Sequence, residues 1–385
     1  MQRAGDRELE GAIVSGRVPG AVALVTGREE TLYCRAFGEA DATTGVPMRE
    51  DTIFQIASMT KAVTSAAALQ LVERGLIDLH APIGRLVPEL AAPQVLEGFD
   101  DAGKPLLRPA RREITLHHLL THTSGISYSF VSAELLRWQT ETRHPQMNTR
   151  AGLAVPLVFE VGERWEYGLG TDWTGLVVEA VTGLTLGDWL AAELTGPLGM
   201  NQTRFRAREE MPADAAKIHA RLPGGGFATV PMNLGSGEFH SGGGGLSSTA
   251  PDYARFLRMV LNEGELDGVR VLKPESVAEM KRDALAAEID QAGVLRSAQP
   301  QISADFDPLP GMRAGWSHGG FLINPETGPA GRSPGSLHWA GIFNTYFWID
   351  PARERGGILM AQVTPFADPG VLGAWTALER MACAM

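Results

Sequence analysis

The sequence predicts an α+β fold, in which an antiparallel β-sheet flanked by helices receives strands from both ends of the chain and a mainly helical domain is inserted. Short apolar runs that suit strands lie at 20–37 and again at 337–363, and segments between them have the apolar spacing of helices. A chain of 385 residues is long enough for two domains. We expect residues 1–75 and 226–385 to form the sheet domain and residues 76–225 the helical domain.

Composition and charge narrow the class of protein. Apolar residues make up 44% and charged residues 21%, as in ordinary globular proteins. The net charge of −11 argues against nucleic acid or an anionic membrane as a partner. Cys34 and Cys383 are too few for a disulfide framework, so we expect two unpaired thiols. Asp6, Glu8 and Glu10 stand where a signal peptide needs an apolar segment, and no run of about eighteen apolar residues follows, which predicts a cytoplasmic location.

The first part of the chain is expected to begin with a short helix over residues 7–17. The apolar runs at 20–25 and 31–37 surround a polar turn, which is typical of a β-hairpin. A long Ala- and Leu-rich segment, 58–74, then predicts a helix. Gly75 stands where a glycine commonly ends a helix.

The middle of the chain and its last third differ in character. The middle is expected to be mostly helical with loops, including helices at 115–120, 175–181 and 186–194. In the last third, Thr249 is expected to cap a helix over 251–261. Aromatic and β-branched runs predict adjacent strands at 337–349 and 356–363, and the chain is expected to close with a helix at 366–382.

The segment Ser58-Met-Thr-Lys61 could carry nucleophilic chemistry. Its serine and lysine are one helical turn apart and face the same side. A serine hydroxyl is a weak nucleophile that needs a base to take its proton, and a buried lysine can serve. The free N–H groups of a helix start can also stabilise an oxyanion. The alternative is a serine that caps the helix beside a solvated lysine, because four-residue S-x-x-K matches also occur by chance.

Two further segments could complete such a site. Tyr167 lies in a glycine-flanked loop just before a helix, where its hydroxyl could serve as a base or proton shuttle. The alternative is an ordinary half-buried aromatic residue. His338-Trp339-Ala-Gly341 lies on an apolar strand that could lend a backbone N–H to an oxyanion hole, or could simply be a core strand.

Three other motifs are interpreted as structural. Gly315-Trp-Ser317-His-Gly319 matches the lipase G-x-S-x-G elbow, but a breaker-rich loop precedes it, an apparent strand follows it, and the order of triad partners fails. His117, His118 and His122 lack the glutamate of a zinc-binding helix, so a metal is not expected. The glycine run of residues 241–245 lacks a phosphate-loop context and is interpreted as a loop whose backbone approaches another segment closely.

With S-x-x-K, the tyrosine loop and the W-x-G strand in one order, the chain resembles the serine β-lactamase-like superfamily. Within it, the sequence is most similar to the family VIII carboxylesterases, which share the class C β-lactamase fold. The likeness covers most of the chain and includes residues 48–54, 114–125, 197–200 and 241–249. The resemblance implies an active site in the cleft between the two domains.

The resemblance also implies roles for individual residues. Ser58 would be the acyl-forming nucleophile, Lys61 its partner and Tyr167 the third catalytic residue. The backbone N–H groups of Ser58 and Ile342 would hold the oxyanion. Leu169, Trp339 and Gly341 would bind substrate, the first two at the mouth of an apolar site. Neither a metal nor an organic cofactor is implied.

Two departures from the β-lactamases favour neutral esters as substrates. Those enzymes carry Y-x-N where this chain has Tyr167-Gly-Leu169, and K-T-G where it has Trp339-Ala-Gly341. Losing the lysine that would meet an antibiotic carboxylate should weaken anionic substrates. We therefore expect a cytoplasmic serine carboxylesterase that acts on small-molecule esters. An acyltransferase of the same fold, a β-lactamase or other amide hydrolase, and a non-catalytic sensor on a penicillin-binding scaffold are the alternatives.

Overall fold

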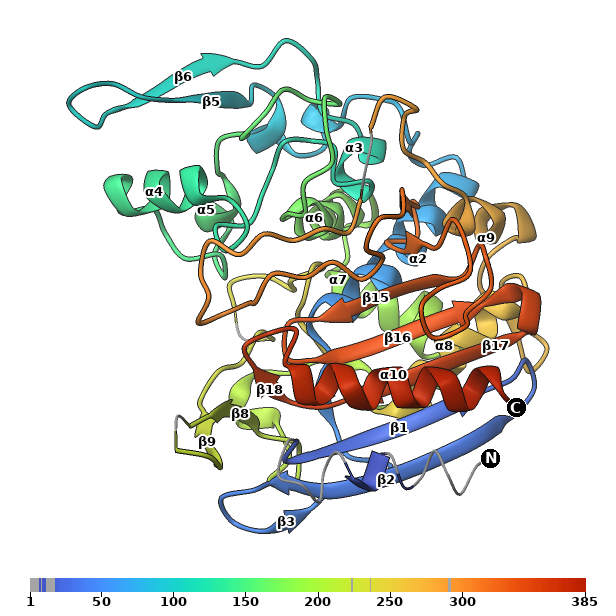
Figure 1. Ribbon diagram of the computed structural model, residues 1–385. Coiled ribbons are helices and arrows are strands. Elements are labelled where there is room, and N and C mark those ends of the chain that lie inside the picture. The colour runs from blue at the N-terminus through green and yellow to red at the C-terminus, as the bar shows by residue number, and fades with distance from the viewer. Residues whose placement is uncertain (1–6, 8, 12–17, 223, 236, 290–291) are drawn as a thin grey trace.

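The computed structural model describes residues 7, 9–11, 18–222, 224–235, 237–289 and 292–385. The helix predicted at 7–17 lies largely outside these described residues. Figure 1 shows a large sheet with its helices in the lower part of the view and a group of helices and loops above it.

The sheet is antiparallel throughout and draws on both ends of the chain. Among the described residues it has eight strands in the order β13-β14-β15-β16-β17-β1-β2-β3. In that order their bounds are Gly315–Trp316, Leu322–Ile323, Leu337–Gly341, Thr345–Asp350, Arg355–Met360, Gly20–Thr26, Thr31–Asp41 and Val46–Pro47. N-terminal β1 pairs with C-terminal β17, so that Leu24 lies opposite Ile358. The predicted hairpin and the predicted α+β class are both confirmed.

Helices cover the two faces of the sheet. Helix α10 (Pro369–Cys383) lies in front of it and α8 (Ala250–Leu261) behind it in Figure 1. Every residue of β1 is buried, as expected of an apolar strand covered on both faces. The predicted cap of α8 is confirmed, because the Thr249 hydroxyl accepts a hydrogen bond from the Asp252 N–H. The closing helix is also confirmed and starts at Pro369, with the Asp368 carboxylate as its cap.

Two predicted elements need correction. The segment predicted as one helix over 58–74 is a 3₁₀ turn, η1 (Ala57–Met59), followed by α2 (Thr60–Glu73). Ser58 therefore lies in the turn before the α-helix and does not cap it. The run predicted as one strand over 337–349 is a hairpin of β15 and β16. It reverses at Asn344, whose φ of 63° is a left-handed conformation that asparagine tolerates better than most residues.

The middle of the chain is less helical than predicted. The expected helices are present, with α3 starting at 116, α6 starting at 170 and the third divided into α7 and a π-helical turn, η4. The elements are η2 (Ile83–Arg85), η3 (Pro88–Leu90), β5 (Gln94–Phe99), β6 (Pro105–Pro109), α3 (Leu116–Leu120), α4 (Ala133–Thr142), α5 (Arg150–Leu153), α6 (Gly170–Thr182), α7 (Leu186–Leu190) and η4 (Ala191–Thr195). The β5–β6 hairpin, which the sequence did not indicate, projects from the upper part of the molecule in Figure 1.

Short strands and turns connect these regions. They are β4 (Phe54–Gln55), β7 (Arg204–Phe205), η5 (Arg208–Glu210), β8 (Ile218–Arg221), β9 (Phe227–Val230), β10 (Leu246–Ser248), β11 (Glu265–Leu266), β12 (Val269–Arg270), α9 (Pro274–Lys281), η6 (Pro351–Arg353) and β18 (Val363–Thr364). Strand β10 lies between β4 and β7. This small sheet fixes the chain directly before the 3₁₀ turn that carries Ser58.

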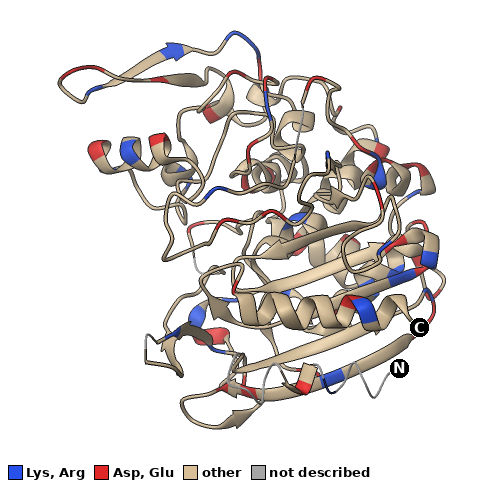
Figure 2. Cartoon of the chain, in the orientation of Figure 1, with Lys and Arg blue, Asp and Glu red and all other residues tan. Residues whose placement is uncertain are grey.

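Charged residues of both signs intermingle along the loops and helices in the view of Figure 2. In the described part of the chain, no single helix combines the length and apolarity needed to cross a membrane, although the bent pair formed by 170–182 and 186–195 meets those criteria jointly.

Candidate active site

Ser58 lies at the junction of the large sheet and α2. It is half-buried on η1, and the preceding Ala57 has a φ of 45°, an unusual conformation for a residue with a side chain. The end of β15 packs directly against this turn. A Cβ atom added to Gly341 would collide with the Thr345 hydroxyl and with the Ile56 carbonyl. Glycine at 341 thus allows the W-A-G strand to reach the turn that carries Ser58.

Lys61 is fully buried, and its ammonium group is the centre of the site. Its Nζ atom lies 3.4 Å from Ser58 Oγ, 3.0 Å from Tyr128 Oη and 2.7 Å from the Gly243 carbonyl oxygen. It also lies 4.7 Å from the centre of the Tyr167 ring, within reach of a cation–π interaction. The structure therefore brings the three predicted catalytic side chains together around one nitrogen atom.

Tyr167 is buried in the loop before α6. Its hydroxyl oxygen accepts a hydrogen bond from the Trp339 indole N–H at 3.1 Å. The two rings are tilted, with centres 5.0 Å apart. An N–H group aimed at this oxygen stabilises negative charge that forms there, which suits a group that takes and returns a proton.

Two residues that the sequence did not single out support Lys61. Tyr128 accepts the hydrogen bond from Lys61 and donates a longer one, 3.5 Å, to Asp172 Oδ2. Asp172 is buried on α6, and its Oδ1 atom accepts hydrogen bonds from the Ser241 hydroxyl at 2.5 Å and the Gly243 N–H at 3.0 Å. Asp172 thus holds Gly243, the residue whose carbonyl oxygen accepts from Lys61. The predicted close approach of the glycine run is confirmed, because Cβ atoms at 242 and 243 would collide with α6.

The two tyrosines beside Lys61 differ in their surroundings. Burial, the Asp172 carboxylate and Tyr167 raise the pKa of Tyr128 well above its usual value. Tyr128 therefore keeps its proton, whereas Tyr167 presents its oxygen to a donor. Tyr128 follows the His-Thr-Ser-Gly stretch at 122–125, but nothing in its spacing indicated a contact with Lys61, 67 positions earlier.

The remaining predicted residues lie nearby in different settings. Ile342 is half-buried in the turn after β15 and packs in a small apolar cluster with Ala57. Trp339 and Leu169 are only 4% and 2% exposed, so both are enclosed rather than open at a mouth. Trp339 touches Tyr167, and Leu169 stands at the start of α6 within the main core. Their roles in binding substrate, like the oxyanion role of Ile342, stay predictions.

Aromatic rings surround the far side of Tyr167. Trp316 packs edge-on against Trp339, with centres 4.6 Å apart, and His122 lies 4.8 Å from Tyr167 by the same measure. His122 is fully buried with no hydrogen-bond partner for either ring nitrogen among the described residues. Burial and the nearby Lys61 hold the pKa of His122 well below its usual value, so its imidazole is neutral. His122, Trp316 and Trp339 thus form an aromatic box around Tyr167.

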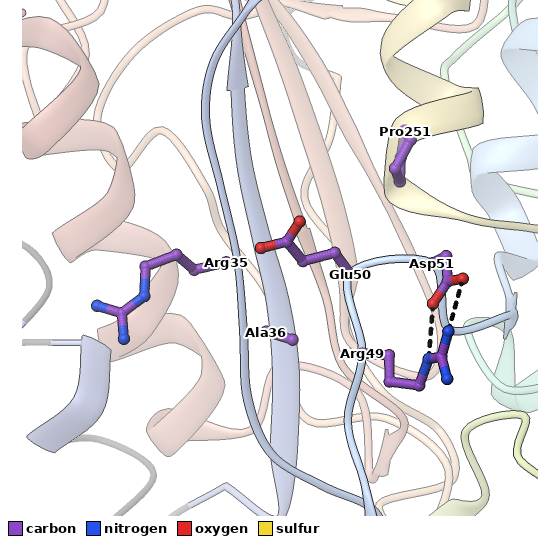
Figure 3. A pocket seen from close by; sticks show the side chains of 6 residues that line it. All are labelled: Arg35, Ala36, Arg49, Glu50, Asp51 and Pro251. Atoms are coloured by element: carbon purple, nitrogen blue, oxygen red, sulfur yellow. Dashed lines mark hydrogen bonds and ion pairs between the residues drawn. The ribbon is translucent and has the colours of Figure 1, made fainter.

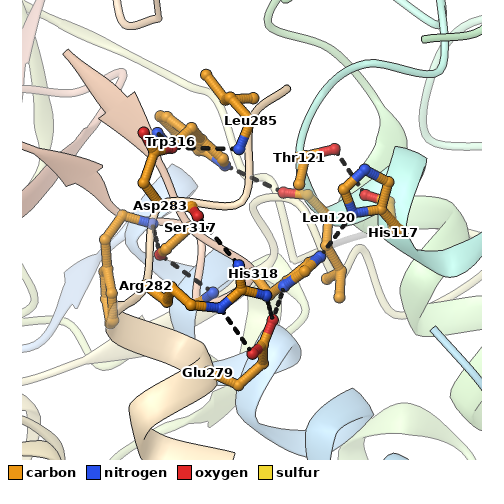
Figure 4. Close-up of polar contacts among 12 residues, drawn as sticks. His117, Leu120, Thr121, Glu279, Arg282, Asp283, Leu285, Trp316, Ser317 and His318 are labelled. Carbon is orange, nitrogen blue, oxygen red and sulfur yellow. Dashed lines mark hydrogen bonds and ion pairs between the residues drawn. The ribbon is translucent and has the colours of Figure 1, made fainter. Parts of the chain in front are cut away.

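The G-x-S-x-G match is structural, as predicted. The Ser317 hydroxyl is fully buried and accepts hydrogen bonds from the N–H groups of Gly319 and Phe321, which closes the turn between β13 and β14. A strand follows this serine where the elbow needs a helix. The neighbouring His318 contacts Glu279 and His117 instead (Figure 4). Among the described residues, no group of three or more His, Cys, Asp or Glu side chains is arranged to hold a metal ion.

A separate hollow of about 590 Å³ lies between β2, the loop after β3 and the start of α8. Its lining residues are Arg35, Ala36, Arg49, Glu50, Asp51 and Pro251 (Figure 3). Arg49 and Asp51 pair with each other at 3.0 Å, and the Arg35 guanidinium points away from Glu50 in Figure 3. These charges do not converge on a common point, and none of these residues belongs to the Ser58 site.

Comparison with known proteins decides the family. The family model described as Beta-lactamase matches residues 6–381. The chain belongs to the beta-lactamase family. The predicted resemblance to the serine β-lactamase-like superfamily and the predicted fold are therefore confirmed.

The similar proteins of this family include both acyltransferases and an esterase. Monacolin J acid methylbutanoyltransferase from Aspergillus terreus is 35% identical over 93% of this chain and 90% of its own length. Lovastatin esterase from Penicillium rubens is 35% identical over 92% of this chain and 91% of its own length. Unliganded simvastatin synthase from Aspergillus terreus has a TM-score of 0.84 at 30% identity, covering 99% of this chain and 98% of that chain. This protein is thus an enzyme of the serine hydrolase and acyltransferase group with the β-lactamase fold.

Proposed function

We propose that this protein is a serine carboxylesterase that hydrolyses short-to-medium acyl esters through an acyl-enzyme on Ser58. The observation that carries the proposal is the position of Lys61 Nζ, which is buried, 3.4 Å from Ser58 Oγ and over the Tyr167 ring. A serine hydroxyl with two proton-transfer groups at hand can act as a nucleophile.

The proposed reaction has two halves. In the first, Tyr167 and Lys61 take the Ser58 proton as its oxygen attacks the carbonyl carbon of the ester. The N–H groups of Ser58 and Ile342 hold the oxyanion, the acyl C–O bond breaks, and the proton goes to the departing alkoxide. In the second half, water attacks the acyl-enzyme, its proton follows the same route to Ser58, and the carboxylic acid leaves. The reaction requires no metal or organic cofactor.

The surroundings of Ser58 support neutral, apolar acyl groups. The side chains of Val230, Leu234 and Ile342 are partly buried and pack against the cluster that contains Ala57, the neighbour of Ser58. In the W-A-G segment no lysine is present to meet a substrate carboxylate. Apolar contacts of this kind favour acyl chains over charged substrates and argue against efficient turnover of β-lactam antibiotics.

Acyl transfer to an alcohol is the second candidate function. A methylbutanoyltransferase and an esterase are equally similar to this chain, at 35% identity over nearly its whole length. Both activities would use the same acyl-enzyme and differ only in whether water or an alcohol accepts the acyl group.

The test measures hydrolysis of p-nitrophenyl esters from acetate to octanoate, beside a chromogenic cephalosporin. We expect short-to-medium esters to be hydrolysed with burst kinetics, and the cephalosporin poorly or not at all. A fluorophosphonate probe should label Ser58, and the Ser58→Ala variant should not be labelled. Efficient cephalosporin turnover with feeble ester hydrolysis would contradict the proposal, and absence of both activities and of labelling would favour a non-catalytic protein.

The acceptor is tested by adding an alcohol. If hydrolysis is the function, the ratio of acid to new ester should stay high when secondary alcohols are added at millimolar concentration. A transferase would release p-nitrophenol faster with the alcohol present and form mostly the new ester, because the alcohol would relieve slow deacylation.

The role of Lys61 in proton transfer is tested by substitution. Lys61→Arg should be nearly as inactive as Lys61→Ala, because arginine retains its proton. Substantial activity in a folded Lys61→Arg variant would mean that this residue supplies positive charge only.

A further inference from the structure

Two motifs left without a role in the proposed reaction meet in the structure. Helix α3 carries His117, and the turn between β13 and β14 carries His318, 201 positions later. Figure 4 shows the two imidazoles side by side, with Glu279 of α9 on the far side of His318. The three side chains join three elements that are distant in the sequence.

Hydrogen bonds link these side chains in series. Glu279 Oε1 lies 2.6 Å from His318 Nδ1, and His318 Nε2 lies 2.8 Å from His117 Nδ1. An ionised carboxylate only accepts, so His318 Nδ1 carries the hydrogen. In a neutral His318 the Nε2 atom then accepts, and His117 Nδ1 must donate. His117 thus donates to His318, and His318 donates to Glu279. These two hydrogen bonds fix the orientation of both rings.

The charge states suit this arrangement. Although burial opposes it, hydrogen bonds from Arg282 and His318 lower the pKa of Glu279, which is therefore ionised. Burial lowers the pKa of His318 despite the nearby carboxylate, and burial together with the neighbouring His318 lowers the pKa of His117 to about 3. Near neutral pH the series thus joins one carboxylate to two neutral imidazoles.

Strand β13, which leads into the turn held by this series, carries one of the aromatic residues around Tyr167. Trp316 is two positions before His318, and its indole N–H donates to the Leu120 carbonyl of α3 at 3.0 Å. Its ring packs against Trp339 and against Tyr167, with centres 4.6 and 6.5 Å away. Strand β13 and the turn after it are therefore tied to α3 at two points, and Trp316 packs against the Tyr167 ring.

We propose that Glu279, His318 and His117 form a positioning relay that holds Trp316 in place and thereby fixes Tyr167 and Trp339 for proton transfer. This inference rests on the proposed function, in which Tyr167 moves the Ser58 proton. None of the three residues touches the reacting atoms. Small errors in the position of a proton-transfer group are costly to the chemical step and leave substrate binding largely unchanged.

The test compares two substitutions of equal polarity at one residue. In His117→Asn the amide nitrogen reaches the place of Nδ1 and can still donate to His318. In His117→Gln the amide reaches the place of Nε2 and the donor to His318 is lost. We expect His117→Asn to keep kcat within about threefold of the wild type, and His117→Gln to lower kcat at least tenfold with KM within about twofold.

Controls separate this inference from the proposed function. Arg28→Gln removes an exposed ion pair with Glu354 that has no contact with the relay, and it should leave kcat unchanged. Fluorophosphonate labelling of Ser58 in the wild type tests the nucleophile separately, and thermal melting checks folding. Equal kcat in the Asn and Gln variants, whether high or low, or a KM change without a kcat change, would overturn the relay even with Ser58 labelled normally. Failure of Ser58 to label would instead overturn the proposed function.

Discussion

Replacing Trp339 with phenylalanine removes one hydrogen bond of the candidate site. The indole N–H of Trp339 donates to Tyr167 Oη at 3.1 Å, and phenylalanine keeps an aromatic ring there without a donor. If negative charge forms on Tyr167 during the reaction, the lost bond is one to a charged acceptor, worth about 1.5–3 kcal/mol. Because each 1.36 kcal/mol corresponds to about tenfold in rate, kcat should fall about 10- to 150-fold.

The loss of ring volume must be separated from the loss of the donor. Trp339 is almost fully buried, so the smaller ring also lowers the free energy of unfolding, by about 1–3 kcal/mol. Trp348 provides a matched control. It is equally buried on the neighbouring strand β16, and its indole nitrogen has no hydrogen-bond partner among the described residues. Trp348→Phe should thus be destabilised similarly and keep its kcat.

The assay is kcat and KM for p-nitrophenyl butyrate in the two variants, with thermal melting followed by circular dichroism. We expect a selective loss of kcat in Trp339→Phe. If both variants retain the same kcat, the indole donor has no part in the chemical step, and the assignment of Tyr167 as the group that moves the proton loses its main structural support.

Three further predictions follow from the same structure. Ser58→Ala should abolish ester hydrolysis, whereas Ser317→Ala should remain active with a lower melting temperature, because the Ser317 hydroxyl only accepts two backbone hydrogen bonds. Tyr167→Phe should lower kcat by about 10²-fold or more and Tyr128→Phe by clearly less, measured on one ester with a folding control. Because burial lowers the pKa of His117 to about 3, the unfolded chain binds a proton below pH 6.5 that the folded chain does not. The free energy of unfolding should therefore decrease as the pH is lowered from about 6.5 towards about 3, by at most about 1.4 kcal/mol per pH unit from this group. In His117→Asn the urea midpoint should depend less on pH over the same range.

Local patterns in the sequence were sufficient for the parts of the fold and site that depend on near neighbours. The spacing of Ser58 and Lys61 already places both on one side of the same segment, and the cap at Thr249 needs only a residue three positions later. The hairpin at 337–349 was missed because apolar character runs through it. Gly341 and Asn344 were the signals of a turn, and Asn344 adopts the left-handed conformation that the reversal requires.

Contacts between distant segments had no comparable signal. Tyr128 and Asp172 are 44 positions apart, and each looks ordinary in its own segment. Their importance arises only when folding brings α6, the glycine loop and α2 together. The same holds for His318, which the sequence presented as part of a failed lipase motif and which the structure joins to a histidine from another failed motif.

The way in which Asp172 supports Lys61 bears on how a buried lysine can move protons. A buried ammonium is costly unless it is paired, and a direct carboxylate partner would hold its proton firmly. Among the described residues no ion pair joins Lys61 to a carboxylate; Asp172 instead acts through the Gly243 residue, by its N–H group, and through Tyr128. This indirect link supplies hydrogen-bond acceptors for the ammonium while it leaves Ser58 Oγ as the remaining polar neighbour. The arrangement suits a lysine that exchanges a proton with its serine. For the same reason, Asp172→Asn should damage catalysis more by misplacing the Gly243 carbonyl than by removing a counter-charge.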